Sequence, residues 1–172
     1  PLKISSKNKK IHVAYRVQFS DVAYYDFLVQ AGLTPNKSKS IQRVKVPDVY
    51  WCDFLRGLFD GDGSVYGYYD KRWPTSLLYY LTITSASKEF LEFVHRKNCD
   101  LIKVKGGSIR RAKGAYILSY AKYDTRLIAK CLYTSEMSLC LLRKKSKLLT
   151  FINNDKSGRI VPNARVVKLV YT

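Results

Sequence analysis

The sequence predicts a protein of the α+β class, in which helices alternate with pairs of antiparallel strands. From residue 51 onwards, segments with apolar residues at helical spacing are separated by short runs rich in tyrosine and β-branched residues. The short runs come in pairs, and each pair is joined by a polar or glycine-containing turn of the kind that closes a β-hairpin. With 172 residues, 47% of them hydrophobic, the chain is long enough to bury a core.

The first 46 residues predict a segment of strand, helix and loop that precedes the main domain. Ser20 or Asp21 is placed to cap the helix, and Gly32 ends it. The expected elements are strands at 2–6 and 12–19, a helix at 22–31, a loop at 33–38 and a basic extended connector at 41–46.

Residues 47–155 predict the main domain, which follows the order helix, strand, strand, helix, strand, strand, helix, helix. Ser85 or Ser87 caps its second helix, and residues 101–105 are expected to be extended. Residues 156–172 are expected to form a C-terminal arm or an added strand. The expected elements after the first helix are strands at 64–69 and 77–84, a helix at 88–96, strands at 108–111 and 115–121, and helices at 124–133 and 141–152.

The charge of the chain indicates a polyanionic partner. Lys and Arg outnumber Asp and Glu by 31 to 13, which gives a net charge of +18. Because each phosphate that a basic residue neutralises releases counterions, we expect nucleic acid as the partner. The alternatives are a basic surface that is merely solvated and, less favoured, an anionic membrane surface, for which no strongly amphipathic basic helix is visible.

The four cysteines do not predict a metal site or a disulfide framework. Cys52, Cys99, Cys131 and Cys140 form no Cys-x-x-Cys pair, and the two histidines are isolated. We therefore expect buried, reduced thiols. No apolar run is long enough to span a membrane and no signal peptide is visible, so we expect an intracellular protein, cytoplasmic or organellar, without a membrane partner.

The run from Phe54 to Gly63 predicts a helix that ends in a carboxylate between two glycines. Pro47 precedes the helix, and Asp48 is a candidate N-cap. Gly57 lies inside the helical pattern, where glycine is unfavourable unless another backbone approaches closely. The apolar face of this helix consists of Trp51, Phe54, Leu55, Leu58 and Phe59.

The end of this helix is a candidate metal site. Gly61 and Gly63 let the chain leave the helix and hold Asp62 between them. If two such helices pack through their glycine faces, their carboxylates and nearby carbonyls form an oxygen-rich site that suits Mg²⁺. The simpler interpretation is an amphipathic helix that ends in a solvated acidic turn.

Residues 55–63, with the sequence LRGLFDGDG, resemble the signature helix of the LAGLIDADG homing endonucleases. Arg56 departs from the family pattern, which has a small residue there. The resemblance implies an αββαββα half-unit whose antiparallel, saddle-shaped sheet binds DNA. It implies that Asp62 binds Mg²⁺ or Mn²⁺ with the Gly61 carbonyl as a further ligand. Gly57, Phe54 and Leu58 would form the interface with a second signature helix.

The function implied by this resemblance is site-specific, metal-dependent cleavage of double-stranded DNA, linked to intron or intein mobility. Asp62 and Lys144 would be the catalytic residues, with Lys145 as the alternative for Lys144 by one position. The other possibility is a DNA- or RNA-binding protein on the same fold that does not cleave, such as an intron maturase or a transcription regulator.

Basic and aromatic residues of the two predicted hairpins are candidates for contact with DNA. They lie in strands or in the turns between them, from which side chains reach the major groove or its phosphates. These candidates are Tyr66, Tyr68, Lys71, Arg72, Arg110, Arg111 and Lys113.

A weak internal repeat relates residues 1–46 to the later part of the chain. Residues 15–21 and the helix after them parallel residues 116–124, and Lys37 is the counterpart of Lys144. Residues 1–46 are then either the remainder of a first half-unit or an N-terminal extension. The second signature helix would come from a homodimer partner or from a missing first half. A homodimer implies a nearly palindromic target.

Overall fold

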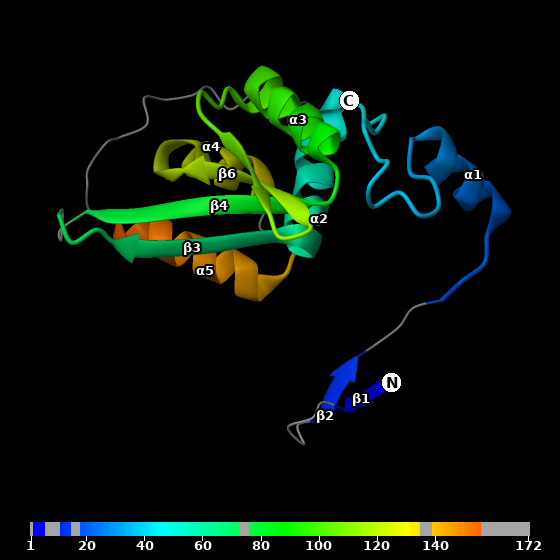
Figure 1. Ribbon diagram of the computed structural model, residues 1–172, viewed down its shortest axis with the longest axis horizontal. Helices are drawn as coiled ribbons and strands as arrows, with labels where there is room; N and C mark the ends of the chain where they lie inside the picture. Colours follow the sequence, from blue (N-terminus) through cyan, green and yellow to red (C-terminus); the bar gives the residue numbers. More distant parts are fainter. Residues whose placement is uncertain (1, 6–10, 15–17, 73–75, 135–138, 156–172) are drawn as a thin grey trace.

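The computed structural model describes residues 2–5, 11–14, 18–72, 76–134 and 139–155 (Figure 1). In these residues the chain forms five α-helices, a four-stranded antiparallel sheet and a separate two-stranded sheet, which confirms the predicted α+β class. None of the described helices is long and apolar enough to cross a membrane. The C-terminal arm predicted for 156–172 lies outside the described residues.

The N-terminal segment contains a short hairpin and one helix. β1 (Leu2–Ser5) pairs with β2 (Ile11–Ala14), and α1 (Val22–Gln30) follows. Of the two predicted candidates, Asp21 is the N-cap of α1, and its carboxylate accepts a hydrogen bond from the amide of Tyr24 at 2.9 Å. The strand predicted to reach residue 19 is too long, because the chain has already left the strand at residue 18.

The predicted signature helix is α2 (Trp51–Asp62), and it begins differently from the prediction. Asp48 does not cap it. A short 3₁₀ turn, η1 (Asp48–Tyr50), comes first, and the carboxylate of Asp48 instead accepts a hydrogen bond from Lys97. One side of α2 is fully covered, since Trp51, Leu55 and Phe59 are buried in the core.

The remaining elements confirm the αββαββα order and add one helix at the end. The sheet has the strand order β3-β4-β6-β5, and neighbouring strands are antiparallel throughout. The elements are β3 (Gly63–Tyr69), β4 (Leu77–Ser85), α3 (Lys88–Lys97), β5 (Ser108–Ala112), β6 (Ala115–Ala121), α4 (Lys122–Leu132) and α5 (Leu142–Asn154). Ser87 caps α3 by accepting from the amide of Phe90, as predicted.

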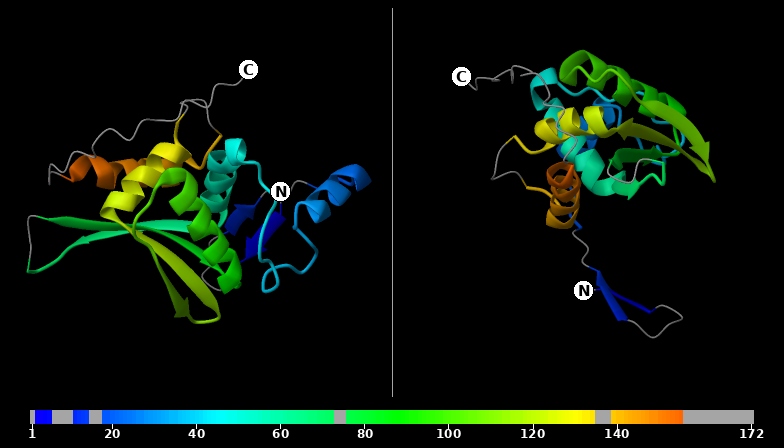
Figure 2. Two further views of the ribbon diagram at one scale, coloured as in Figure 1. Left: turned by 90° about the horizontal axis from the view of Figure 1, so that it is seen from above. Right: turned by 90° about the vertical axis from the view of Figure 1, so that its left-hand side faces the viewer.

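The sheet has one covered face and one open face, which the strand register identifies. Val65, Leu81 and Tyr120 lie side by side across β3, β4 and β6, and all three are buried beneath the helices. The neighbouring row contains Tyr66 beside Tyr80 and is accessible. Because successive side chains of a strand point to opposite faces, this register assigns every strand residue to one face or the other. Figure 2 shows the helices packed on one side of the sheet from two further directions.

The segment after α3 differs from the prediction of an extended chain. A turn of π-helix, η2 (Asn98–Ile102), continues α3, and Lys103 then adopts a left-handed conformation with φ of 63°. The cause is a buried polar contact. Asn98 accepts a hydrogen bond from the indole of Trp51 at 2.9 Å and donates one to the hydroxyl of Tyr120 at 3.0 Å. Since a buried side-chain amide must keep its hydrogen-bond partners, this network fixes the position of Asn98 and of the backbone that follows α3.

The prediction that the cysteines are reduced thiols is wrong for Cys52 and Cys131. The two are joined by a disulfide that links α2 to α4 across a sequence separation of 79 residues. Their Cα atoms lie 5.3 Å apart, within the usual range for a disulfide. The spacing along the chain gave no sign of this pair, because the packing of α4 against α2 brings it together. Cys99 and Cys140 are free.

Replacing Cys131 by serine is expected to lower the free energy of unfolding of the unreduced protein by about 2–4 kcal/mol, the usual contribution of a disulfide that closes a long loop. Urea denaturation with and without a thiol reductant measures the effect. In reductant the difference between wild type and variant should nearly vanish, and Cys99→Ser serves as the control. A loss of the same size in reductant would assign the effect to packing instead of to the disulfide.

Candidate active site at the end of the signature helix

Asp62 is the last residue of α2, and its side chain is exposed. No described residue donates a hydrogen bond to its carboxylate, so both oxygens are available to a ligand. The following Gly63 is extended, with φ of −85°, so the chain leaves the helix at this residue. A residue larger than glycine does not fit at Gly63, since a Cβ there would lie 2.3 Å from the ring of Phe59.

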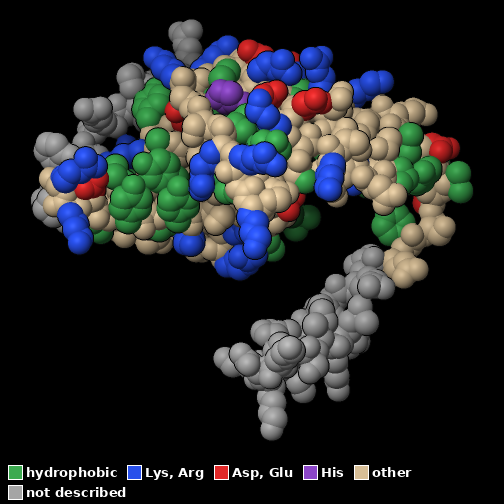
Figure 3. All heavy atoms as spheres, viewed as in Figure 1, with side chains coloured by type: hydrophobic (Ala, Val, Ile, Leu, Met, Phe, Trp, Pro, Cys, Tyr) green, Lys and Arg blue, Asp and Glu red, His purple; other side chains and the backbone are tan. Residues whose placement is uncertain are grey.

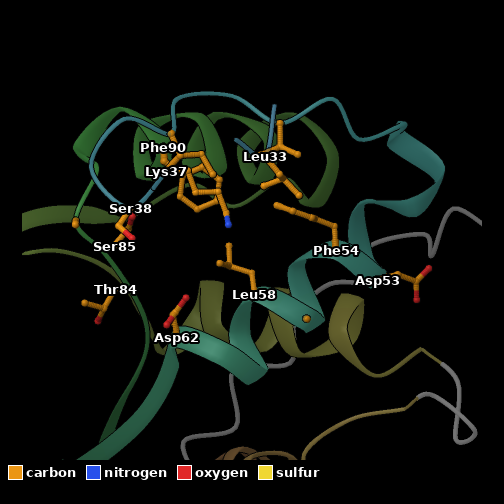
Figure 4. Close-up of a pocket in the computed structure, with 14 residues that line it drawn as sticks. Leu33, Lys37, Ser38, Asp53, Phe54, Leu58, Asp62, Thr84, Ser85 and Phe90 are labelled. Atoms are coloured by element: carbon orange, nitrogen blue, oxygen red, sulfur yellow. The ribbon is translucent and has the colours of Figure 1, made fainter. Parts of the chain in front are cut away.

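The carboxylate of Asp62 points into a cavity of about 680 Å³, called here the α2 cavity (Figure 4). Three segments enclose it: the loop after α1, the exposed flank of α2, and the junction of β4 with α3. The ammonium of Lys37 points into the same space in Figure 4. The lining residues are Leu33, Lys37, Ser38, Ile41, Val44, Asp53, Phe54, Gly57, Leu58, Asp62, Thr84, Ser85, Ala86 and Phe90.

The three residues predicted to form a helix interface all line the α2 cavity. Phe54 and Leu58 are only half-buried, although they belong to the apolar pattern of α2. Gly57 is exposed, and a Cβ built on it would meet nothing within 4 Å. The close backbone contact that Gly57 predicts is therefore not made by the described part of this chain. The side of α2 that carries Phe54, Gly57 and Leu58, called here the glycine flank, is open.

Lys144 lies at the other side of the same helix end, 82 positions along the chain from Asp62 by their residue numbers. Its ammonium donates to the carbonyls of Phe59 and Asp60, each at 2.8 Å, and to that of Gly63 at 2.6 Å. The carbonyl of Gly61 is 3.5 Å away. Burial and the neighbouring Arg143 lower the pKa of Lys144, while the carboxylates of Asp60 and Asp62 act in the opposite direction.

Asp60 and Arg56 face away from the α2 cavity and hold the connection between α4 and α5. The carboxylate of Asp60 accepts a hydrogen bond from the amide of Leu141 at 2.9 Å. Arg56 donates to the carbonyls of Leu132 and Leu139 and pairs with Asp53. The departure of Arg56 from the family pattern thus has a local explanation: the long side chain binds carbonyls that a small residue would leave without a partner.

Asp62 and the carbonyl of Gly61 supply oxygen donors, which hard cations such as Mg²⁺ and Mn²⁺ prefer. Within the described residues, no three His, Cys, Asp or Glu side chains gather to complete a metal site. Two oxygen donors fill only part of the coordination shell of such a cation, which is octahedral for Mg²⁺.

The open face of the sheet carries an aromatic cluster. Tyr66 and Tyr68 are exposed, and both stack on Tyr80, with ring centroids 5.3 and 6.4 Å apart. In Figure 3, hydrophobic side chains gather over β3 and β4, with Lys and Arg side chains around them. Tyr80 was missed by the sequence analysis, since alternation alone does not say which face of β4 is open.

The predicted basic DNA contacts divide between two faces and two turns. Arg110 pairs in register with Ile117 on the row of the open face, whereas Arg111 pairs with Tyr116 on the row of the covered face. Lys71 and Arg72 lie in the turn between β3 and β4, and Lys113 lies in the turn between β5 and β6. The guanidinium of Arg72 is bound to both oxygens of Asp70, which offsets its charge.

The polar rim of the α2 cavity also contains residues that the sequence analysis did not select. Ser38, Thr84 and Ser85 line the cavity together with Asp62. Their hydroxyl groups come from the loop after α1 and from the end of β4, which lie far apart in the sequence. No motif marks them, so only the fold brings them to the site.

Comparisons with known proteins give one family match and several similar solved structures. Residues 52–96 match the family model of the LAGLIDADG-like domain. The crystal structure of the homing endonuclease I-TnaI is similar over 59% of this chain and 69% of that chain, with 17% identity and a TM-score of 0.44. The homing endonuclease I-CvuI, crystallised in complex with its target in the presence of Ca, is similar over 62% of this chain and 66% of that chain, with 14% identity and a TM-score of 0.46.

No curated protein sequence matches this chain. The family match begins within α2 and ends within α3, so it contains the glycine flank, Asp62 and the hairpin of β3 with β4. Residues 52–96 are therefore similar to a LAGLIDADG-like domain, and the resemblance predicted from the signature stretch is confirmed.

Proposed function

We propose that this protein is a site-specific, metal-dependent endonuclease that cleaves double-stranded DNA. One observation carries the proposal. Asp62, in the segment that matches the LAGLIDADG-like domain, ends α2 as an exposed carboxylate to which no described residue donates a hydrogen bond. The net charge of +18 supports DNA as the substrate, because a polyanion is the partner that this surface attracts.

In the proposed reaction Asp62, with the carbonyl of Gly61, would hold Mg²⁺ or Mn²⁺. A bound cation of this kind supplies Lewis-acid activation of water and neutralises charge on the phosphate. Lys144 supplies positive charge at the end of the same helix, and Lys37 lies in the α2 cavity with Asp62. The products expected from the family resemblance carry 5′-phosphate and 3′-hydroxyl ends.

The proposed site is complete only when a second signature helix packs on the glycine flank of α2. Gly57, Phe54 and Leu58 would contact that helix, as their position in the α2 cavity supports. The helix comes from a homodimer partner or from a first half-unit. Residues 1–46 are proposed to be the remainder of such a unit or an extension, residues 47–155 the endonuclease domain and residues 156–172 an arm.

The open face of the sheet is proposed to bind the DNA duplex. Tyr66, Tyr68 and Arg110 project from it, and the turn residues Lys71, Arg72 and Lys113 lie at strand ends where phosphates can be reached. Arg111 belongs to the row of the covered face, so its contribution to DNA binding is expected to be smaller than that of Arg110.

Incubation of the protein with a library of duplex sites and Mg²⁺ tests the proposed function. Double-strand cuts at a defined sequence are the expected result. Specific binding without metal-dependent cutting would favour the second candidate, a DNA- or RNA-binding protein of the maturase or regulator type, and would exclude the nuclease. The exposed tyrosines, which suit stacking on unpaired bases, are the observation that keeps this candidate.

Arg110→Ala is expected to weaken binding to duplex DNA more than Arg111→Ala does, although the two residues are neighbours. Loss of one phosphate contact should reduce the salt slope of the association constant by about 1. Fluorescence anisotropy with a labelled duplex at several salt concentrations measures both variants. Arg111→Ala is the matched control because it removes the same charge from the other row of the strand. Equal effects of the two substitutions would contradict the assignment of the open face.

A further inference from the structure

The position of Lys144 suggests a role other than contact with the substrate. A lysine ammonium has three N–H donors. Phe59, Asp60 and Gly63 accept all three through their backbone carbonyls, at 2.8, 2.8 and 2.6 Å. No donor is left over for a phosphate or for a water molecule in this arrangement.

Two of the three carbonyls that Lys144 binds, those of Phe59 and Asp60, belong to the last turn of α2, and the third belongs to its C-cap, Gly63. The last four carbonyls of an α-helix have no amide of the helix to bind, and they form the negative end of its dipole. At the end of α2 the amide of Gly63 satisfies only the carbonyl of Phe59. The ammonium of Lys144, which also lies 5.4 Å from the centre of the Phe59 ring, neutralises this end from the side opposite the α2 cavity.

The backbone of Lys144 is held as firmly as its ammonium. Its amide binds the carbonyl of Leu141 in the first turn of α5, and the amide of Leu141 is bound by the carboxylate of Asp60. Farther along α5, Leu148 is buried and Phe151 stacks on Tyr79 with ring centroids 6.2 Å apart. The docking of α5 therefore determines where the ammonium of Lys144 sits, and it sits against the end of α2.

We propose that Lys144 is a positioning residue, which holds the carbonyl end of α2 so that the Asp62 carboxylate faces the α2 cavity. The consequence of this role for cleavage rests on the proposed function. The effect of Lys144 on the end of α2 does not depend on catalysis. Lys144 then acts on a metal through the ligands, as outer-shell partners of metal sites do. Lys37, whose ammonium points into the α2 cavity, remains the lysine with access to the substrate.

Lys144→Met, which removes the ammonium and keeps the chain length, tests this role without any substrate. Amide hydrogen exchange of the segment 59–66 is expected to become about tenfold faster, because charge-assisted hydrogen bonds that restrain the helix end are lost. Lys145→Met is the matched control. The ammonium of Lys145 lies over the ring of Tyr133, 5.4 Å from its centre, and its loss should leave exchange in the segment unchanged.

A second measurement uses Mn²⁺ alone, with binding to the protein followed by electron paramagnetic resonance. Lys144→Met should raise the Mn²⁺ concentration for half-saturation by about 10–100-fold, the usual effect of removing an outer-shell partner. The part of the Mn²⁺ signal that is lost in Asp62→Asn belongs to the proposed metal site. Lys144→Arg, which keeps the charge and several donors, should recover part of both the exchange protection and the Mn²⁺ affinity. Lys144→Gln provides a milder variant if the methionine variant does not fold.

Unchanged exchange and unchanged Mn²⁺ binding in Lys144→Met, combined with a slower cleavage step, would overturn the proposal and would make Lys144 a catalytic residue in contact with the substrate. If the wild-type protein cuts no DNA under any condition, the proposed function fails. The exchange and Mn²⁺ measurements then still decide the role of Lys144.

Discussion

Replacing Asp62 by asparagine is expected to slow DNA cleavage by at least about a thousandfold while leaving DNA affinity nearly unchanged. The amide keeps the size of the side chain but removes the negative charge that would bind the cation. A catalytic metal contributes several kcal/mol to the stabilisation of the transition state, and each 1.36 kcal/mol is a factor of ten in rate. Single-turnover kinetics with Mg²⁺ on a selected target site measure the effect.

The fold should tolerate this substitution, which makes the result easy to interpret. Asp62 is exposed and receives no hydrogen bond from the described residues, so the free energy of unfolding should change by less than about 0.5 kcal/mol. Asp53→Asn is the matched control, because Asp53 is an exposed carboxylate of the same helix and lines the same cavity. Cleavage by Asp62→Asn at the wild-type rate would remove Asp62 from the proposed metal site.

The position of Asp62 could be predicted from the sequence because its signals are local. The helical spacing of Trp51, Leu55 and Phe59 and the glycines around Asp62 lie within thirteen consecutive positions, 51–63. The same is true of the hairpins and of the caps at Asp21 and Ser87. The αββαββα order follows from such local patterns, and the structure confirms it.

The contacts that complete the site could not be predicted, because they join segments far apart in the chain. Lys144 was selected by resemblance, but its three carbonyl partners become visible only when α5 packs beside α2. The disulfide between Cys52 and Cys131 depends in the same way on the packing of α4. Arg110 and Arg111 look equivalent in sequence, and only the register of β5 with β6 separates them. These contacts could not be predicted because they depend on tertiary packing between distant segments.

Replacing Gly57 by leucine is expected to have opposite effects on the single chain and on its assembly. A leucine at an interior helix position is more favourable than glycine by roughly 0.5–1 kcal/mol. Because a Cβ at Gly57 would meet nothing within 4 Å, the side chain has room in the single chain. The melting temperature of the isolated protein should therefore stay the same or rise.

The second signature helix should be unable to dock on the variant. Added bulk in a close contact costs about 1–3 kcal/mol, and a symmetric dimer carries the substitution twice, which gives roughly 2–6 kcal/mol. Sedimentation of the protein over a range of concentrations measures the association, and cleavage should be lost with it. Ser146→Leu, which adds leucine at an exposed position of α5, is the control and should assemble normally. Because a destabilised fold would lower the melting temperature along with association, a raised melting temperature with lost association assigns the defect to the interface. Full assembly and cleavage by Gly57→Leu would show that the second helix binds elsewhere than the glycine flank of α2.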